Sequence, residues 1–305
     1  VGGCYQIYDF DRSSCSMDST LPRMILSPFL LLGFLLTMPV YFVEPFVARR
    51  VQSRMSLFSE GCSSSYSDDV CKVVRVPSEE FPSISWAVRK IRPPESCPLR
   101  IEVEPGLYEE ENIRVEKWVE IVGKGDVCVR GSLTLTKQAT GSSVVGLTFV
   151  KPNKRDRRYS TVRIEAANFT LANCTVQGGT IGVYVGGNWN VKGEIRDCLI
   201  RESLDGIYVE GAASPVIQDN VIEDTHVGIR CGRWGCPHLV QNTVRRAQKH
   251  GIAASQRSCP EITNNLIEEC NEYGIYVACT AEATISQRAE TYINCQKGDL
   301  SYNCG

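Results

Sequence analysis

The chain has 305 residues, of which 43% are hydrophobic and 22% are charged, values that are typical of a soluble globular protein. Its formal net charge of −2 gives no reason to expect a nucleic acid as a partner. Fifteen cysteines form an odd number in a long chain, which argues against a compact disulfide framework. The sequence has no CxxC pair and only three histidines, so we expect neither a metal ion nor a cofactor.

The first 55 residues contain a hydrophobic span, residues 24–43, in which no side chain is charged. A span of 20 residues is just long enough to cross a hydrocarbon core of about 30 Å, and it predicts a membrane anchor. Two prolines interrupt the span, so a signal sequence and a segment outside the mature protein remain alternatives. If the span inserts, the arginines that follow it favour a cytoplasmic location for the rest of the chain. Residues 56–72 are rich in serine and acidic residues and are typical of a linker.

The segment after the linker predicts short strands around one helix. Residues 73–76 form a short apolar run that we expect to be the first strand. Residues 84–91 place apolar side chains at helical spacing on one face, directly after a Pro-Ser start signal. Three further strands are predicted from alternating apolar residues at 101–103, 113–115 and 119–122.

Between residues 171 and 277 the chain repeats one pattern five times. Each pass has an apolar residue, two spacers, a small residue, and a second apolar residue two positions later. The small residue is, in chain order, Cys174, Cys198, Asn220, Asn242 and Asn265. Each pass continues with a glycine and a β-branched residue, and the glycines are 24, 22, 23 and 23 residues apart: Gly182, Gly206, Gly228, Gly251 and Gly274. A fixed period of this length indicates stacked units that share one hydrophobic core.

We therefore predict an all-β fold, a single-stranded parallel β-helix of roughly eight coils over residues 73–305, with a helix at its N-terminal end. The period decays after Ile285, which is consistent with a C-terminal end that is truncated or covered by a partner. Opposite charges alternate from coil to coil at one position of the repeat: Arg201, Glu223, Arg245 and Glu268. We expect these charges to pair on a solvated face, which accounts for the acidic residues without catalysis.

Several of the cysteines that make the chain cysteine-rich fall at repeat positions, where a small buried side chain suits the core. Cys236 and Cys259 each precede the repeat proline on neighbouring coils. Because adjacent strands lie about 4.8 Å apart, the geometry would permit a disulfide between them.

Residues 101–110 read IxVxPGxYxE, and residues 113–125 read IxVxKxVxIxGxG. This opening resembles that of the pectin lyase-like superfamily of right-handed parallel β-helices, which includes pectinesterases, polygalacturonases, pectate lyases and alginate epimerases. The later repeats resemble the coils of F-box-type and of carbohydrate-binding or sugar-hydrolase-type β-helix proteins. The resemblance implies that the helix plugs the open end of the first coil, and that Asn220, Asn242 and Asn265 turn inward and hydrogen-bond along the stack.

The motifs that carry catalysis in those enzyme families are not found in this chain. Residues 250–252, His-Gly-Ile, are similar to an element of polygalacturonases, but the paired aspartates and the Arg-x-Lys element that accompany it are missing. Tyr108 and Glu110 match the opening of pectinesterases, whose later aspartate and arginine motifs are also missing. We therefore expect no catalytic residues.

Two loops are the candidate binding sites. The most basic stretch predicts a contact with an anion, and its alternative is a solvated loop: Lys151, Lys154, Arg155, Arg157, Arg158 and Tyr159. The second candidate pairs tryptophans with polar groups that suit the stacking and hydroxyl contacts of a sugar: Tyr184, Asn188, Trp189, Asn190, Arg233 and Trp234.

The preferred interpretation is a non-catalytic recognition scaffold that binds a protein or a glycan on one face of the β-helix. The alternative is a polysaccharide-modifying enzyme of the pectin lyase-like type, a lyase, hydrolase or esterase, with a non-standard site. A third interpretation, a membrane-tethered structural module, depends on residues 24–43. The fold alone does not separate the three, because many functions share this scaffold.

Overall fold

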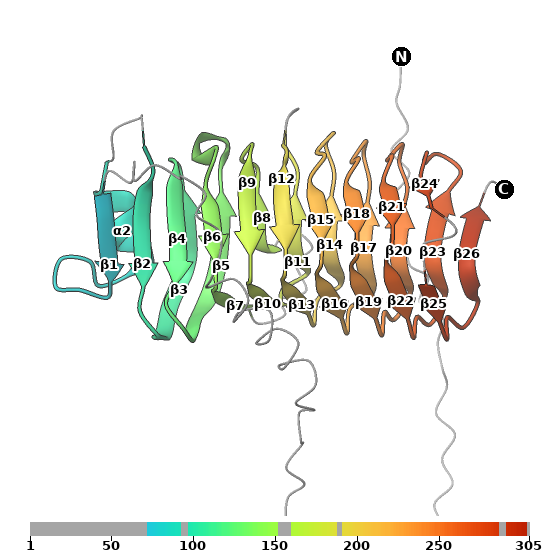
Figure 1. Ribbon diagram of the computed structural model, residues 1–305, viewed down its shortest axis with the longest axis horizontal. Coiled ribbons are helices and arrows are strands. Elements are labelled where there is room, and N and C mark those ends of the chain that lie inside the picture. Colours follow the sequence, from blue (N-terminus) through green and yellow to red (C-terminus); the bar gives the residue numbers. More distant parts are fainter. Residues whose placement is uncertain (1–71, 93–96, 152–159, 188–190, 287–290, 304–305) are drawn as a thin grey trace, which may run out of the picture. The chain divides into compact units, whose positions relative to one another are not determined.

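The computed structural model describes residues 72–92, 97–151, 160–187, 191–286 and 291–303. The hydrophobic span 24–43 and the linker up to residue 71 lie outside these residues, so their predicted roles stay predictions. The described residues form a parallel β-helix of about nine turns, with a helix near its N-terminal end (Figure 1). Within them, the structure has no helix that is both long enough and apolar enough to cross a membrane.

Three faces of parallel strands surround the core. Each turn contributes one strand to the first sheet and two strands to a second, folded sheet. The strands of the first sheet stack in the order β1 (Lys72–Val76), β2 (Leu99–Val103), β4 (Val119–Gly123), β6 (Ser143–Val145), β9 (Phe169–Ala172), β12 (Gly193–Arg196), β15 (Val216–Gln218), β18 (His238–Val240), β21 (Glu261–Thr263) and β24 (Thr284–Ile285).

The second sheet has two arms that form the other two faces. One arm contains β7 (Thr148–Lys151), β10 (Thr175–Gly178), β13 (Leu199–Arg201), β16 (Val221–Glu223), β19 (Thr243–Arg245), β22 (Leu266–Glu268) and β25 (Thr291–Ile293). The other contains β8 (Ser160–Ile164), β11 (Ile181–Val185), β14 (Asp205–Val209), β17 (Val227–Cys231), β20 (His250–Ala254), β23 (Tyr273–Ala278) and β26 (Gly298–Asn303). We call this second arm the aromatic face, because its strands carry Tyr184, Tyr208, Tyr273 and Tyr276.

Two long strands at the N-terminal end join the arms. β3 (Gly106–Val115) pairs with β5 (Val127–Leu135), and β5 in turn pairs with both β7 and β8. The sequence marks only the last part of β3 as a strand, because the earlier part alternates less clearly. The structure has about nine turns, against the roughly eight coils predicted.

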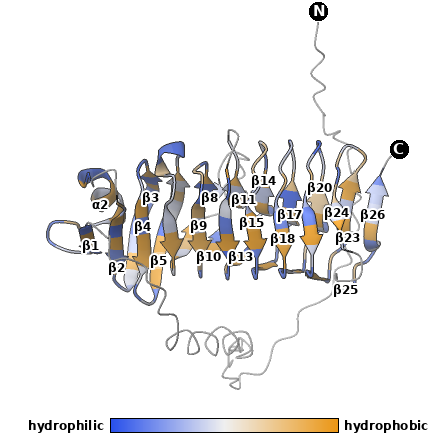
Figure 2. Cartoon of the chain, turned by 45° about the horizontal axis from the view of Figure 1, so that its top comes forward, coloured by the Kyte–Doolittle hydropathy of each residue, from blue (hydrophilic) through white to orange (hydrophobic). Residues whose placement is uncertain are grey.

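The core is built by equivalent residues of successive rungs. On the first sheet Ile195 pairs with Ile217, Ile217 with Leu239, and Leu239 with Ile262, and all four side chains are fully buried. Burial of such a side chain contributes about 1.5–3 kcal/mol. Hydrophobic and hydrophilic residues are interspersed along the strands (Figure 2), as expected when alternate side chains face the core.

The repeat glycines are required by close contact between neighbouring rungs. A Cβ added to Gly206 would lie 2.5 Å from the carbonyl oxygen of Gly228, and one added to Gly228 would lie 2.5 Å from that of Gly251. Real side chains do not approach a carbonyl this closely. The glycine of the repeat is therefore fixed by sterics.

The helix α2 (Ile84–Lys90) confirms the predicted helix, and it is capped from two directions. The Ser83 hydroxyl accepts a hydrogen bond from the Trp86 backbone N–H at 3.2 Å. The buried Glu110 carboxylate on β3 accepts the Ile84 N–H at 2.7 Å, the Ser85 N–H at 3.2 Å and the Ser85 hydroxyl. The carboxylate satisfies N–H groups that a helix start leaves unpaired, so the glutamate of the opening motif has a structural role.

Asn220, Asn242 and Asn265 lie one above the other in the core, and each is 1% exposed. The Asn220 side-chain amide donates to the Asn242 Oδ1 at 2.9 Å, and the Asn242 amide donates to the Asn265 Oδ1 at 3.0 Å. Each Oδ1 also accepts a backbone N–H from the preceding rung, and Cys198 continues the stack by donating its N–H to Asn220 at 3.0 Å.

The corner at each asparagine is made by the residue before it, which adopts the left-handed conformation. The residues that precede them have the positive φ: Asp219 (55°), Gln241 (55°) and Asn264 (58°). The left-handed residue turns the chain, and the next side chain then points into the core.

The predicted pairing across rungs is seen between Glu223 and Arg245, whereas Arg201 donates to the Gln177 side chain at 3.2 Å, and Glu223 is buried rather than solvated. Arg245 lies 2.7 Å from the Glu223 carboxylate, and Arg246 contacts both Glu223 at 3.0 Å and Asp224 at 2.8 Å. The Arg246 guanidinium lowers the pKa of Asp224. These acidic groups are therefore held as ion-paired carboxylates, which supports their structural interpretation.

Candidate functional site

One column of outward side chains runs along the aromatic face. Backbone pairing places Arg163, Tyr184, Tyr208, Arg230, Ala253 and Tyr276 at equivalent positions of successive rungs. In each strand the two flanking residues are apolar and face the core, so the residue between them must face outward. The repeat therefore builds a stripe of tyrosines and arginines on this face.

Two tyrosines near the N-terminal end of this stripe share one carboxylate. The Tyr184 hydroxyl donates to the Glu210 Oε1 at 2.8 Å, and the Tyr208 hydroxyl donates to the Oε2 at 2.7 Å. The Arg163 guanidinium lies over the Tyr184 ring, 4.2 Å from its centroid. Burial and the Glu210 carboxylate raise the pKa of Tyr184 to about 12 and also raise that of Tyr208. Both phenols are therefore protonated hydrogen-bond donors at neutral pH.

The arginines of the face are paired with carboxylates. The Arg230 guanidinium lies 2.8 Å from Asp205, and Arg163 lies 2.7 Å from Glu165. Arg233, on the loop after β17, approaches Glu210 at 3.6 Å. These ion pairs hold the guanidinium groups in place on the face.

A groove of about 320 Å³ opens beside this column, between β17, β20 and β23. Its walls include Arg230, Lys249, Tyr273 and Tyr276, and the small Ala253 lies between the larger column residues Arg230 and Tyr276. The hollow arises because alanine fills a position that tyrosine or arginine occupies on the rungs around it. Its lining combines aromatic, basic and hydroxyl groups, and Ser255 and Glu272 complete it.

His250 lies in the wall of the groove and is only 5% exposed. Its ring stacks on Tyr276, with a centroid distance of 4.7 Å and an interplanar angle of 7°. Its Nε2 lies 3.5 Å from the Glu272 carboxylate, and its buried Nδ1 has no hydrogen-bond partner among the described residues. The structure thus places a buried imidazole of β20 beside a groove.

His250 should make the protein less stable in acid. Burial lowers the pKa of His250 from 6.5 to about 4, so the unfolded chain binds the proton first as the pH falls. We expect the free energy of unfolding to decline from pH 6.5 to pH 4, and to decline less in His250→Gln. Urea unfolding at several pH values measures this difference. His238→Gln, at an exposed site on β18, serves as the control and should leave the decline unchanged.

The structure describes part of each predicted binding loop. Lys151 ends β7, and its ammonium donates to the Ser160 carbonyl at 3.3 Å, while the rest of that loop lies outside the described residues: Lys154, Arg155, Arg157, Arg158 and Tyr159. Of the second loop, Asn188, Trp189 and Asn190 also lie outside them. Tyr184 and Arg233 come together at Glu210, as described above.

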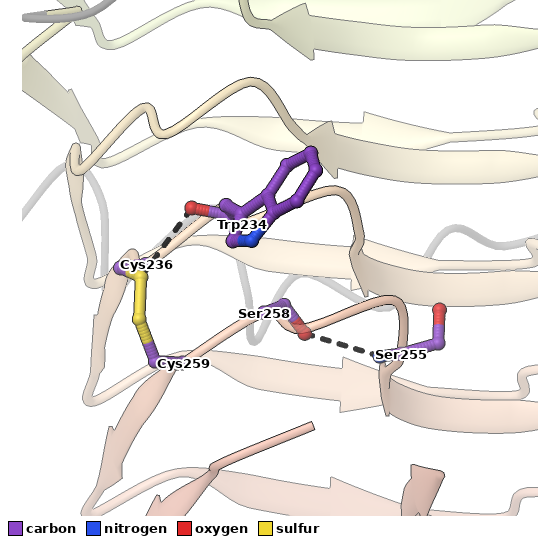
Figure 3. Close-up of a disulfide and its surroundings, with 5 residues drawn as sticks. All are labelled: Trp234, Cys236, Ser255, Ser258 and Cys259. Atoms are coloured by element: carbon purple, nitrogen blue, oxygen red, sulfur yellow. Dashed lines mark hydrogen bonds between the residues drawn. A yellow bond between two sulfur atoms is a disulfide. The ribbon is translucent and has the colours of Figure 1, made fainter. Parts of the chain in front are cut away.

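Trp234 lies on an exposed corner that a disulfide holds in place (Figure 3). Trp234 is 55% exposed, and the Trp234 backbone N–H donates to the Gln256 carbonyl at 3.2 Å. Cys236 and Cys259 form a disulfide between neighbouring rungs, with a Cα–Cα distance of 4.5 Å. The structure thus contains the disulfide whose geometry the sequence permits.

The sequence interpretation missed the residues that build most of the site: Tyr208, Glu210, Arg230, Glu272, Tyr273 and Tyr276. A signal was present, because Tyr208, Arg230 and Tyr276 directly follow the Gly-Ile of successive repeats. Among the described residues, no group of three His, Cys, Asp or Glu side chains is placed to hold a metal ion.

Comparison with known proteins gives one family and several solved structures. Residues 160–304 match the family described as right handed beta helix region, whereas none of the curated proteins matches this chain. A pectate lyase is similar at 12% identity over 76% of this chain and 79% of its own, with a TM-score of 0.46. A pectin methylesterase from Aspergillus niger is similar at 13% identity over 77% of this chain and 86% of its own, with a TM-score of 0.44. ORF18 of Geobacillus virus E2 is similar at 11% identity over 85% of this chain and 64% of its own, with a TM-score of 0.50.

At these identities the likeness to solved structures concerns the fold alone. The family match gives the right-handed sense of the β-helix. The parallel stacking of the rungs agrees with a β-helix. The described residues therefore form a right-handed parallel β-helix, and residues 160–304 match the family model of that description.

Proposed function

We propose that this protein is a non-catalytic recognition scaffold and that its aromatic face binds a glycan. The observation that carries the proposal is the groove between β17, β20 and β23, where Tyr276 and Tyr273 lie next to Arg230 and Lys249. Aromatic rings offer flat apolar surfaces on which a sugar ring can stack. Arginine and lysine donate hydrogen bonds to sugar hydroxyls and, more strongly, to sugar carboxylates.

The polarity of the face favours a glycan over a protein partner. The fully buried centre of a protein interface is depleted in charged residues. Here the centre of the face carries Arg230 paired with Asp205, and Glu210 paired with two tyrosines. Bonded polar groups that are already oriented suit a ligand rich in hydroxyls, because each can add a hydrogen bond at small entropic cost.

The pairing of the carboxylates favours binding over hydrolysis. A glycosidase needs one carboxylic acid that is protonated at the working pH, opposite a second carboxylate. Glu210 accepts hydrogen bonds from two protonated phenols, and Asp205 is paired with Arg230 at 2.8 Å. Both carboxylates are engaged by donors of the protein itself, which favours a structural over a catalytic role for them.

One observation favours the enzyme alternative. The His250 imidazole stays neutral at neutral pH, and its Nε2 lies 3.5 Å from the Glu272 carboxylate in the groove wall. A neutral imidazole in a groove is a candidate general base for a polysaccharide-modifying enzyme such as a lyase or an esterase. Its low pKa makes it a weak base, which is why we rank this function second.

Binding of oligosaccharides to the full chain tests the proposal. Calorimetry with a polyuronate and with neutral oligosaccharides should detect binding of at least one of them. Tyr276→Ala and Arg230→Ala should each weaken it about tenfold, which corresponds to about 1.4 kcal/mol. Trp86→Ala removes an exposed aromatic ring from α2, at the N-terminal end, and should leave binding unchanged.

The same preparations should release no new reducing ends and no unsaturated products, with or without calcium. Cleavage that is lost in His250→Gln or in Glu272→Gln would establish the enzyme alternative. If no glycan binds, or if Tyr276→Ala and Trp86→Ala behave alike, the glycan proposal is wrong and a protein partner becomes the interpretation to pursue.

A further inference from the structure

Cysteines occupy equivalent positions on neighbouring rungs at three places among the described residues. Cys236 and Cys259 are bridged, with Cα atoms 4.5 Å apart. Cys174 and Cys198 each lie one residue before the paired residues Thr175 and Leu199. Cys270 and Cys295 each lie two residues after the paired residues Glu268 and Ile293.

The rung spacing puts every such pair within reach of a disulfide. Parallel strands are about 4.8 Å apart, and disulfides join Cα atoms that are about 4.4–6.8 Å apart. The Cys236–Cys259 bridge shows that this chain accommodates the bond between rungs without losing their alignment (Figure 3). The two remaining pairs differ in how far an oxidant can reach them.

The Cys270–Cys295 pair combines a fixed backbone register with partial access to solvent. The Gln296 N–H donates to the Cys270 carbonyl at 2.9 Å, which holds the two backbones in register at this point. The Cys270 thiol donates to the Glu268 carbonyl at 3.7 Å. Cys270 is fully buried, whereas Cys295 is only half-buried. Cys174 and Cys198, in contrast, are both only 2% exposed.

We propose that Cys270 and Cys295 are a modification site, which forms a second disulfide between rungs when the protein meets a glutathione disulfide. The Cys295 thiolate attacks a sulfur of oxidised glutathione, which forms a mixed disulfide and releases one reduced glutathione. The Cys270 thiol then loses its proton and attacks the Cys295 sulfur, which releases the second reduced glutathione. Two protein thiols are oxidised, one glutathione disulfide is reduced, and the two thiol protons pass to the two glutathiones.

The bond would fix one wall of the groove. Cys295 precedes Lys297 by two residues, and the Lys297 ammonium lies 2.9 Å from the Glu272 carboxylate. Glu272 lies in turn 3.5 Å from His250 in the groove wall. Among the described residues, β25 and β26 each pair with a neighbouring strand on one side only, so a covalent link there restricts the turn between them, which carries Lys297. This consequence holds for the groove whichever ligand it takes.

Burial raises the pKa of Cys270 to about 12 and also raises that of Cys295. Because the thiolate is the attacking species, the rate of the exchange should rise with pH between neutral and mildly alkaline solution. The bridge, once formed, is shielded by the same burial.

Disulfide mapping of the full chain tests the proposal. The reduced protein is incubated with oxidised glutathione, denatured, alkylated without reduction, and digested with trypsin and a glutamate-specific protease. Cleavage after Glu269 and Glu272 separates Cys270 from Cys279, so each partner can be assigned by mass spectrometry. We expect the Cys270 peptide joined to the Cys295 peptide, alongside the Cys236–Cys259 link as an internal control.

The variants separate this pair from the other thiols. Cys295→Ser should abolish the joined peptide, whereas Cys279→Ser, which removes a neighbouring exposed thiol, should keep it. Oxidation should also slow amide exchange in β25 and β26 about tenfold or more in the unmodified sequence. If Cys270 and Cys295 are both alkylated while Cys236 and Cys259 are joined, or if Cys270 is joined elsewhere, the proposal is overturned.

Discussion

Replacing Gly228 with alanine should destabilise the β-helix by about 3 kcal/mol or more. The added Cβ would lie 2.5 Å from the Gly251 carbonyl oxygen and 2.3 Å from the Val244 Cγ1. Neither atom can move away freely, because the strand of Gly251 pairs on both sides and Val244 is buried in the core. Urea unfolding monitored by circular dichroism measures the loss.

Gly232→Ala is the matched control, since this glycine follows the same strand, β17. A Cβ there would lie 3.2–3.3 Å from the ends of the Tyr208 and Gln256 side chains, which can rotate. We expect a loss below about 1 kcal/mol. Equal losses in the two variants would show that the repeat glycine is not selected by contact between rungs.

Asn242→Ala should cost about 2–4 kcal/mol, the second largest effect that we expect. Asn242 accepts hydrogen bonds from the Asn220 N–H and amide, at 3.2 and 2.9 Å, and donates to Ile217 and Asn265, at 2.8 and 3.0 Å. Alanine would leave the Ile217 carbonyl and the Asn220 N–H without these partners in a site that water does not reach. The free energy of unfolding at neutral pH measures the cost.

Two further variants test the reason for this cost. Gln248→Ala truncates an exposed amide on the same turn and should change stability by less than about 0.5 kcal/mol. Asn242→Cys places at this position the residue type found at Cys174 and Cys198, and should be intermediate, because a thiol replaces only part of the hydrogen bonding. A cost for Asn242→Ala no larger than that for Gln248→Ala would show that the ladder does not stabilise the fold.

The fold could be predicted from the sequence because its repeat has a simple physical cause. A rung must return to the same place, so residues such as Ile217 and Gly228 recur at nearly constant spacing. The long strand β3 was recognised only in part, because Glu109, Glu110 and Glu111 interrupt the alternation that marks a strand. The structure explains this exception, since Glu110 turns inward to cap α2.

The site was harder to predict, because it is built by contacts between residues one rung apart. Tyr184 and Glu210 are 26 residues apart in the sequence, and the residues around each of them do not predict their hydrogen bond. The sequence interpretation looked for tryptophans and basic runs in loops, whereas the structure gathers tyrosines and arginines on a strand face. The groove depends on a small residue, Ala253, and a missing side chain leaves no positive signal in a sequence.

The charge alternation has a consequence for how the chain assembles. Because the sign changes from rung to rung over four successive rungs, a strand that skipped one of them would bring Arg201 against Arg245, or Glu223 against Glu268. The aliphatic positions would accept such a misalignment, since they are nearly identical from rung to rung. Like charges placed directly opposite each other penalise it. The surface charges thus disfavour out-of-order stacking of rungs during folding, which the nearly identical core residues would not prevent.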